Sequence, residues 1–284
     1  MKSLEARLKF RNHVGNSISH LRFLHIPKTA GSTFRQVLIR QYPGKGRFDF
    51  RGDITADIER FHVLPEEEKR NIVLFEGHAP ITTGIQEADQ TIITFLRDPI
   101  RRVMSFCQHV YEGKSPYLLQ DFPPEKFSLD EFLASGNTEL SNLQTKMLIN
   151  QGSSASPDLI DRLPASEVVD RALKNLSEKI VCFGLQEYFD ESLILFATQF
   201  SWRTLTYDSV NRANSSRKLE FKDHHLKRIA ELNAIDIEVY KLAKEKFLGQ
   251  IGEKNFNTKL YRRLKSTLYW RSLWKKFGKK PRDN

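Results

Sequence analysis

The stretch from Leu21 to Leu38, LRFLHIPKTAGSTFRQVL, predicts a strand, a tight loop and a helix in succession. Its first residues are mostly apolar and typical of a short buried strand. Pro27 and Gly31 then mark a loop. Ser32 and Thr33 stand where a helix is capped, and apolar residues recur after them at helical spacing. The arrangement predicts an anion site, because backbone N–H groups and the helix dipole at a helix N-terminus both favour negative charge.

The loop also carries a cation, Lys28, which adds a full positive charge to the predicted anion site. An ordinary strand–loop–helix connection without a ligand is the alternative. The common triphosphate loop has four residues between two glycines, followed by Lys and Ser or Thr. Here the lysine precedes the glycine, so the order differs. The residues that we expect to hold the anion are Pro27, Lys28, Thr29, Ala30, Gly31, Ser32 and Thr33.

A second anion-binding pattern follows the apolar run 91–96, which predicts a buried strand. Arg97 comes directly after this strand, and Ser105 follows eight residues later on a predicted helix. An arginine fork and a hydroxyl suit a phosphate group. Asp98 is expected to cap the helix, with Pro99 at its first position. Ligands bind beyond the carboxyl ends of parallel strands, so the two patterns are expected to share one site.

The rest of the chain alternates predicted strands and helices, which favours a three-layer α/β/α fold with a mainly parallel sheet. We expect one domain over residues 1–258 and a separate basic tail or helix over 259–284. Residues 41–52 are expected to form a loop. Further strands are expected at 71–75, 180–184 and 202–207, and helices at 54–70, 164–178, 191–200 and 223–247.

PKTAGST and RDPIRRVMS together resemble the 5′-phosphosulfate and 3′-phosphate motifs of sulfotransferases that use 3′-phosphoadenosine 5′-phosphosulfate (PAPS). Residues 20–248 resemble the carbohydrate sulfotransferase family that contains heparan sulfate 2-O-sulfotransferase, and a bacterial member is expected. The resemblance implies a fold like that of P-loop NTPases. Weaker similarities lie at 142–148, 183–189, 211–217 and 232–240. In the family a segment closes over the nucleotide, which implies cofactor contacts for Arg212, Ser215 and Ser216.

The resemblance implies transfer of the sulfuryl group of PAPS to a carbohydrate hydroxyl, with release of adenosine 3′,5′-bisphosphate and without a metal. Lys28 would neutralise charge on the sulfuryl group and the leaving oxygen. His78 would be the base, because an imidazole accepts protons near neutral pH. The 2-O enzymes read His-Gly-His where this chain reads Glu76-Gly77-His78. Glu76 therefore either orients His78, acts as the base itself, or is a surface residue.

Two other functions compete with this interpretation. One is a P-loop-type kinase of small molecules, which the lysine-before-glycine order disfavours. The other is a non-catalytic glycan- or membrane-binding protein on a sulfotransferase scaffold. The presence of Lys28, His78, Arg97 and Ser105 together argues against that alternative. His109 is expected to line the cleft, and the aromatic residues of loop 112–128 either shape the acceptor site or pack.

The net charge of +10 does not indicate a nucleic-acid partner, because the tail 259–284 carries +9 of it. This tail combines basic and aromatic residues, so it contacts an anionic membrane or glycan, or packs on the domain. No apolar run reaches the length of a membrane-spanning helix. We therefore expect a cytoplasmic enzyme, peripheral at the inner membrane surface, that sulfates a polysaccharide, oligosaccharide or glycolipid. The sequence predicts neither the acceptor nor the oligomeric state.

Overall fold

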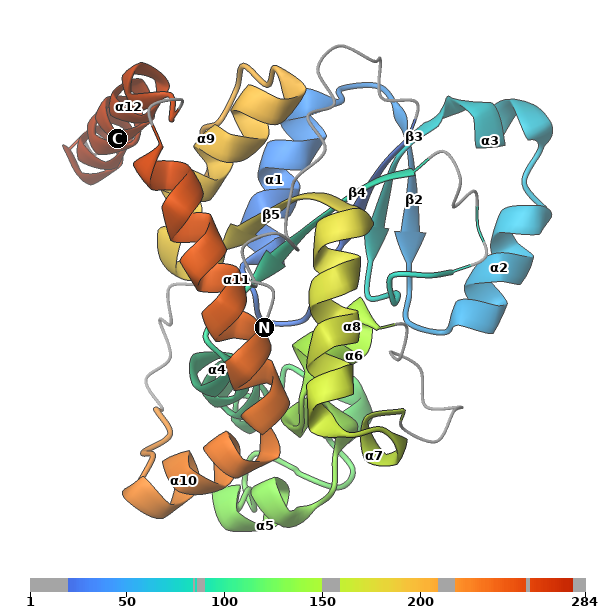
Figure 1. Cartoon of the computed structure of the whole chain (residues 1–284), viewed down its shortest axis with the longest axis vertical. Coiled ribbons are helices and arrows are strands. Elements are labelled where there is room, and N and C mark those ends of the chain that lie inside the picture. The colour runs from blue at the N-terminus through green and yellow to red at the C-terminus, as the bar shows by residue number, and fades with distance from the viewer. Residues whose placement is uncertain are drawn as a thin grey trace, which may run out of the picture.

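A five-stranded parallel sheet forms the centre of the computed structural model, which describes residues 20–83, 85, 90–149, 159–208, 218–253 and 256–277. Its strands are β1 (His20–Leu24), β2 (Gly46–Phe50), β3 (Ile72–Gly77), β4 (Gln90–Leu96) and β5 (Ile180–Leu185). They lie in the order β2-β3-β1-β4-β5 (Figure 1). Leu24 is level with Gly77 of β3 and Thr94 of β4. The central strands therefore end at one edge of the sheet.

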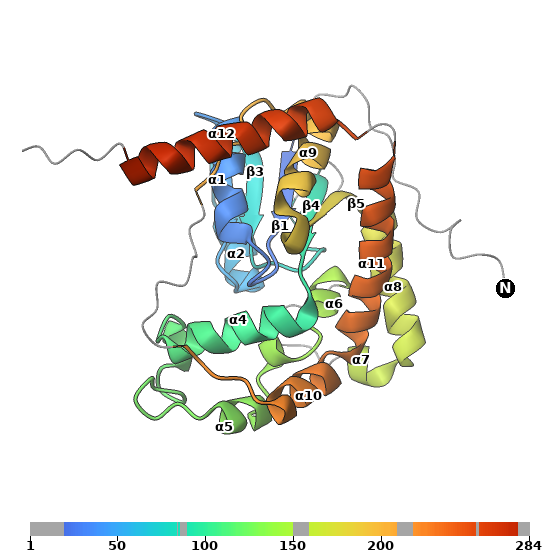
Figure 2. The ribbon, with the colours of Figure 1, turned by 90° about the vertical axis from the view of Figure 1, so that its left-hand side faces the viewer.

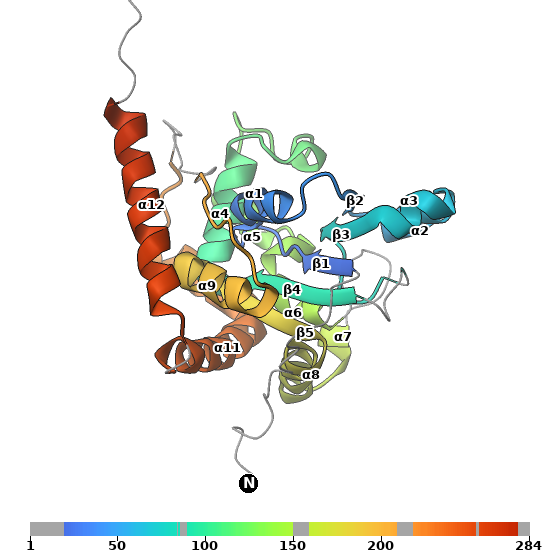
Figure 3. The ribbon, with the colours of Figure 1, turned by 90° about the horizontal axis from the view of Figure 1, so that it is seen from above.

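Helices cover both faces of the sheet and its carboxyl edge (Figures 2 and 3). On one face α1 (Gly31–Gln41) and α9 (Phe189–Phe200) pack, with α12 (Thr258–Phe277) outside α9. The opposite face carries α6 (Leu143–Leu148), α8 (Ala165–Glu178) and α11 (Ala234–Gly252). Beyond the carboxyl edge lie α4 (Pro99–Tyr111), α5 (Leu129–Ala134) and α10 (Asp223–Leu232). The predicted three-layer α/β/α fold is confirmed.

Shorter elements complete the chain. Next to the outer strand β2 lie α2 (Ile54–His62) and α3 (Glu66–Asn71). A single helical turn, α7 (Leu159–Arg162), precedes α8. Turns of 3₁₀ helix span Pro116–Leu118, Thr138–Leu140 and Gln186–Tyr188.

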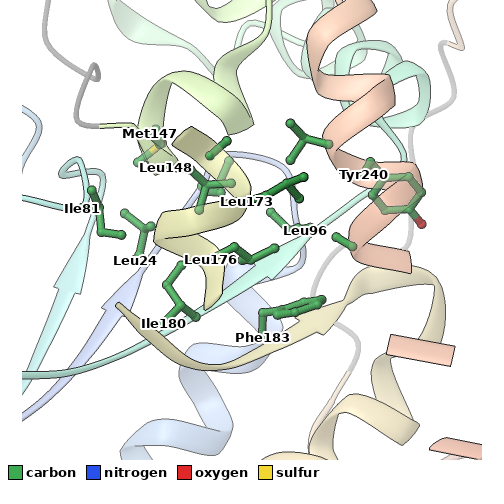
Figure 4. Packing of buried hydrophobic residues seen from close by; sticks show 14 of the residues in the cluster. Leu24, Ile81, Leu96, Met147, Leu148, Leu173, Leu176, Ile180, Phe183 and Tyr240 are labelled. Atoms are coloured by element: carbon green, nitrogen blue, oxygen red, sulfur yellow. The ribbon is translucent and has the colours of Figure 1, made fainter. Parts of the chain in front are cut away.

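Two apolar clusters hold the layers together. In the first, Phe34 of α1 makes edge contacts with Phe23 of β1 and Phe95 of β4, with ring centroids 4.9 and 4.8 Å apart. In the second, leucines of α8 pack on Leu96 and Phe183 of the sheet (Figure 4). Because side chains alternate along a strand, β1 and β4 contribute to both clusters. The central strands are thus buried on both faces, as parallel sheets require.

A buried arginine anchors the loop that follows β3. Arg22 lies within β1 and is 1% exposed. Its Nη1 donates to the carbonyl oxygen of Ile81 at 2.8 Å, and its Nη2 donates to that of Pro80. The guanidinium also lies 5.2 Å from the ring centre of Phe50. These bonds to the protein offset the loss of hydration of the charge.

The boundaries of several elements differ from the sequence predictions. Residues 46–50, predicted as loop, form the edge strand β2, where Phe48 and Phe50 are buried between exposed neighbours. Residues 202–207, predicted as a strand, are irregular, because Arg40 and Gln41 of α1 donate to the carbonyl oxygens of Thr206 and Thr204.

The two longest predicted helices are each interrupted. Helix 54–70 divides at Pro65, which precedes α3 and has no N–H to continue the bonding of α2. Helix 223–247 divides at Asn233. The side chain of Asn233 donates to the carbonyl oxygens of Leu140 and Ile229 and is fully buried. These tertiary bonds fix the bend between α10 and α11.

The tail predicted at 259–284 is helical over most of its length, as α12. Leu264 is buried against the α9 cluster. Tyr261 donates to Glu191 and Lys265 pairs with Asp190, both at 2.7 Å. Part of the tail thus packs on the domain. Among the described residues, none of the helices has the length and apolar character needed to cross a bilayer.

Candidate active site

The loop between β1 and α1 has the geometry of an anion cradle. Lys28 and Ala30 both adopt left-handed backbone conformations, with φ of 69° and 75°. Such conformations are strained for residues other than glycine and are typical of functional turns. The buried Thr29 hydroxyl donates to the carbonyl oxygen of Ile26 at 2.9 Å and holds the turn. Helix α1 begins without a side-chain cap or an acidic residue in its first turn, so no side chain competes with a ligand for the N–H groups of Gly31 and Ser32.

Gly31 is required by the imidazole of His25. A Cβ atom at position 31 would lie 1.8 Å from Nε2 of His25. The His25 ring also stacks on Phe23, with centroids 5.2 Å apart. Burial and the neighbouring His78 hold the pKa of His25 well below its usual value. The His25 imidazole is therefore neutral near pH 7 and packs against the loop at Gly31.

Lys28 and Arg97 bring the two predicted motifs together. Nη1 of Arg97 donates to the carbonyl oxygen of Lys28 at 2.9 Å. Burial, followed by the charge of Arg97, lowers the pKa of Lys28 to about 8. Arg97 Nε is also buried and has no hydrogen-bond partner among the described residues. A buried donor without a partner beside an ammonium group fits a bound phosphate.

The segment after β4 is held at Arg97 and Asp98 by two side chains, the buried Gln144 and the exposed Glu187. Gln144 of α6 accepts from the backbone N–H of Arg97 at 2.9 Å and donates to its carbonyl oxygen at 2.8 Å. Glu187, after β5, accepts from the N–H of Asp98 at 3.0 Å and from the hydroxyl of Tyr240 at 2.8 Å. Gln144, Glu187 and Tyr240 lie in the segments 142–148, 183–189 and 232–240, which show the weaker sequence similarities. Together they position the backbone at Arg97 and Asp98.

Helices α6 and α11 are joined by two reciprocal caps. The Asn142 side chain accepts from the N–H groups of Ile235 and Asp236, at 3.1 and 3.0 Å. Asp236 in turn accepts from the N–H groups of Gln144 and Thr145, at 3.1 and 2.7 Å. Each helix start thus satisfies the N–H groups of the other. The arrangement positions Gln144 and, through it, Arg97.

His78 follows β3 and lies beside His25, which precedes the loop between β1 and α1. Its ring centre is 4.4 Å from that of His25. Its Nδ1 lies 2.9 Å from the carbonyl oxygen of His25. A carbonyl only accepts, so Nδ1 carries the proton and the lone pair of neutral His78 is on Nε2. Gly77 is needed before it, because a Cβ there would lie 2.2 Å from the carbonyl oxygen of Phe50.

Glu76 is 3% exposed, so it is not a surface residue. It accepts from Arg35 Nε at 2.9 Å, and Arg35 also donates to Asp49 at 3.2 Å. Burial raises the pKa of Glu76 to about 7, although Arg35 opposes this shift. The sequence analysis missed Arg35, because no local pattern in α1 indicates that this residue pairs with Glu76 of β3. The group that holds Nδ1 of His78 is the His25 carbonyl.

The other predicted residues fall into two groups. Ser105 and His109 lie one turn apart on α4, beyond the carboxyl edge of the sheet. Burial and, after it, the charge of Lys28 lower the pKa of His109 to about 4. The effect of the Lys28 charge indicates that the His109 side chain faces the same site. Arg212, Ser215 and Ser216 lie outside the described residues.

One group of potential metal ligands occurs among the described residues, formed by Asp130, His224 and His225. The backbone N–H of Lys222 donates to Nδ1 of His225 at 3.1 Å. Neutral His225 therefore carries its proton on Nε2, which lies 3.0 Å from Asp130. A protonated Nε2 cannot ligate a metal, so these residues form a hydrogen-bonded cluster at the start of α10.

Residues 16–243 match the model of the sulfotransferase family, and the chain belongs to that family. It is 24% identical over 271 residues to heparan-sulfate 6-O-sulfotransferase 3-B of Danio rerio, covering 80% of this chain and 63% of that protein. With heparan-sulfate 6-O-sulfotransferase 1 of Homo sapiens the identity is 25% over 297 residues, 87% of this chain and 69% of that protein. The sequence analysis predicted the family that contains heparan sulfate 2-O-sulfotransferase, and membership of the sulfotransferase family is confirmed, with relatives named as 6-O enzymes.

The chain spans less than two thirds of the length of several of these relatives, for example 57% of heparan-sulfate 6-O-sulfotransferase 2 of Danio rerio. Among solved structures, it is similar to mouse sulfotransferase SULT7A1 complexed with PAP, with a TM-score of 0.38 and 14% identity. That similarity covers 78% of this chain and 66% of the other. The chain thus combines membership of the sulfotransferase family with a parallel sheet and a loop between β1 and α1 at its carboxyl edge.

Proposed function

We propose that this chain transfers the sulfuryl group of PAPS to a hydroxyl of a carbohydrate and releases adenosine 3′,5′-bisphosphate. The single observation that carries the proposal is the contact between the two phosphate motifs, where Arg97 Nη1 donates to the Lys28 carbonyl oxygen. This contact supports a single site that combines an uncapped helix N-terminus, an ammonium group and a partly buried guanidinium. PAPS offers two phosphate-bearing ends, which suit such a divided cradle.

In this proposal the loop residues 27–33 bind the 5′-phosphosulfate end, and Arg97 with Ser105 binds the 3′-phosphate. Lys28 stabilises negative charge on the sulfuryl group and the bridging oxygen. Positioning and charge neutralisation are the main demands of a loose in-line transfer. Arg212, Ser215 and Ser216 stay predictions of cofactor contacts.

His78 is proposed as the general base. As the acceptor oxygen forms its bond to sulfur, the bond from sulfur to the bridging oxygen of PAPS breaks, and Nε2 of His78 takes the hydroxyl proton. The His25 carbonyl keeps the proton of the neutral ring on Nδ1. Glu76 is the alternative base from the sequence. Its bond to Arg35 favours a supporting role instead, in which it keeps Arg35 beside the histidine pair.

A thermal-shift comparison tests the nucleotide assignment. Adenosine 3′,5′-bisphosphate should raise the melting temperature at concentrations where ATP with Mg²⁺ does not. The Arg97→Ala variant should lose most of the shift, whereas Arg171→Ala, a matched change of an exposed arginine on α8, should keep it. Stabilisation by ATP with Mg²⁺ alone would favour a kinase and contradict the proposal.

Helix α12 is proposed to contact an anionic membrane surface. Its inner side packs on the domain, and its outer side exposes Lys259, Arg262, Arg263, Tyr269 and Trp270 at helical spacing. Tyr269 and Trp270 are 59% and 65% exposed. Basic residues beside exposed aromatic rings are typical of helices that lie in a membrane interface. A cytoplasmic location and a bacterial origin stay predictions of the sequence.

Sedimentation with phosphatidylserine-containing vesicles tests this contact. The Trp270→Ser and Tyr269→Ser double variant should lose most of its vesicle binding, while its melting temperature stays unchanged because both rings are exposed. Tyr117→Ser, which removes an exposed aromatic residue elsewhere, serves as the control. Equal binding of the double variant and the wild type would remove the membrane role.

A further inference from the structure

A second set of polar side chains lies next to Lys28, along the end of α4 and the turns after it. We call this set the acceptor rim; it consists of His109, Glu112, Lys114, Tyr117 and Glu139. The backbone N–H of Lys114 donates to the His109 carbonyl oxygen at 3.1 Å, so the chain folds back over the end of α4. Nζ of Lys114 pairs with Glu112 at 2.5 Å. Glu112, Lys114 and Glu139 all act electrostatically on Lys28.

Tyr117 gives the rim an exposed aromatic ring. It is 62% exposed, and its hydroxyl donates to Glu139. The other aromatic residues of this loop, Phe122 and Phe127, pack instead against Phe132 of α5, with ring centroids 4.8 and 5.6 Å apart. An accessible ring beside a few polar groups is typical of sites that bind a partly apolar, hydroxyl-rich molecule. The structure thus separates Tyr117 from the packing residues.

The charge of the rim disfavours an anionic acceptor. Its two carboxylates, Glu112 and Glu139, are opposed by one ammonium group, that of Lys114. His109 adds no charge near neutral pH, because burial and Lys28 lower its pKa to about 4. Lys28 and Arg97 are assigned to PAPS, which itself brings several negative charges. Carboxylates are strong acceptors for sugar hydroxyl groups but repel sugar carboxylates and sulfates.

We propose that the acceptor rim binds a neutral sugar unit, without carboxylate or sulfate, and presents its hydroxyl to His78 and Lys28. This inference rests on the proposed sulfotransferase function and names the substrate class. The relatives are named for heparan sulfate, which is a polyanion, so the acceptor proposed for this chain differs from heparan sulfate in its charge. An ion pair within the rim accounts for the preference for a neutral sugar. Lys114 is paired with Glu112, so its ammonium group is not available to the carboxylate of an acidic sugar.

Transfer of labelled sulfate from PAPS to two matched polymers tests this inference with the full chain. One polymer is heparosan, and the other is the same polymer with its uronate carboxylates reduced to alcohols. We expect the reduced polymer to be labelled at least about 10-fold faster, since like charges in a binding site are costly. Labelling of heparosan at an equal or greater rate would overturn the inference. So would labelling of neither polymer by a chain that adenosine 3′,5′-bisphosphate still stabilises.

Failure of the proposed function gives a different result, in which the bisphosphate does not stabilise the chain and label from PAPS reaches neither polymer. Combined Glu112→Gln and Glu139→Gln changes should raise the rate on heparosan relative to the reduced polymer by about 10-fold. The thermal shift with bisphosphate should persist. Glu125→Gln, an exposed glutamate of the same loop, should leave the preference unchanged. An unaltered preference in the double variant would overturn the role of the rim.

Tyr117→Ala provides a second test if the double variant does not fold. Because Tyr117 is exposed, its removal should leave the melting temperature within the range of the wild type. It should raise KM for the reduced polymer about 10-fold, with a smaller effect on kcat, because stacking on the ring contributes to binding. An unchanged KM would contradict the rim as the binding surface.

Discussion

At Lys28 a strained backbone and a partly buried ammonium group occur in the same residue. The left-handed φ of 69° turns the loop toward α1, and the neighbouring guanidinium of Arg97 adds a second positive charge. Strain and like charge both cost stability, and a bound anion offsets the repulsion between the two positive charges. The residue therefore has the properties of a site that is prepared for its ligand.

Replacing Lys28 by alanine should reduce kcat about 100- to 1000-fold, which is the usual loss when one transition-state donor is removed. The fold should persist, because Lys28 is at a loop position and is only partly buried. Labelled-sulfate transfer measures the rate, and the bisphosphate thermal shift shows that the loop still binds. An undiminished kcat in this variant would remove Lys28 from the mechanism.

The lowered pKa of Lys28 predicts a pH dependence. Because the folded-state pKa is about 8, well below the usual value for a lysine, the ammonium group loses its charge as the pH rises through 8. We expect kcat/KM for PAPS to be highest below that pH and to fall above it, since kcat/KM follows the free enzyme. Lys28→Arg should be slower but should not show this fall. A wild-type profile that stays level from pH 7 to 9.5 would contradict the assignment.

For single residues, the sequence predicts the side chains proposed to contact the ligand better than it predicts the groups that position those side chains. Lys28 and Arg97 follow from a local order of residue types, and the structure brings them into contact. Arg35, Gln144 and the His25 carbonyl act across 41, 47 and 53 positions of sequence, so no local pattern signals them.

Among the elements, the short helix α6 holds a residue of the proposed site directly. Its Gln144 satisfies both backbone groups of Arg97, and its start is capped by Asp236 of α11. Strand β4, helix α6 and helix α11 therefore form a single support. Any loosening of α6 should appear at the 3′-phosphate end of the nucleotide site.

Gln144→Leu should lower the affinity for adenosine 3′,5′-bisphosphate about 10-fold, because Arg97 loses its fixed backbone. It should also destabilise the fold by about 1–3 kcal/mol, the usual cost of leaving buried N–H and C=O groups unpaired. Calorimetric titration and thermal melting measure the two effects. Asp57→Leu removes a bond to the backbone N–H of Arg51, beside the outer strand β2, and should affect stability alone. Equal losses of affinity for the bisphosphate in both variants would contradict the role of Gln144 in positioning Arg97.

Element types are largely predictable from the sequence, whereas their limits depend on tertiary contacts. The buried strands β1, β4 and β5 follow from short, mostly apolar runs. The short edge strand β2 lies in a Gly-rich segment and becomes visible only through its pairing with β3. Residues 202–207 have strand-like composition, but the side chains of α1 take their carbonyl groups.

For the whole molecule, α12 closes one side of the domain and exposes a basic aromatic face to the outside. Leu264 is 4% exposed in the cluster that also contains Phe34 and Phe196. This cluster supports α1, whose first residues form the phosphate loop. The tail is thus part of the structure that carries the site.

Leu264→Ala should destabilise the domain by about 2–4 kcal/mol, as expected for a large-to-small change in a packed cluster. Chemical denaturation measures the loss. Leu248→Ala, at a leucine that is 37% exposed on α11, should cost much less and serves as the matched control. A Leu264 variant as stable as the wild type would show that α12 is only loosely attached.

The most direct measurement of the central claim is the transfer of labelled sulfate from PAPS to a carbohydrate by the purified chain. We predict that label enters the reduced, neutral polymer, that adenosine 3′,5′-bisphosphate accumulates in equal amount, and that Lys28→Ala and His78→Ala each abolish most of the transfer. Label that enters no carbohydrate, or that enters it equally fast with both variants, would contradict the assignment of this site to sulfuryl transfer.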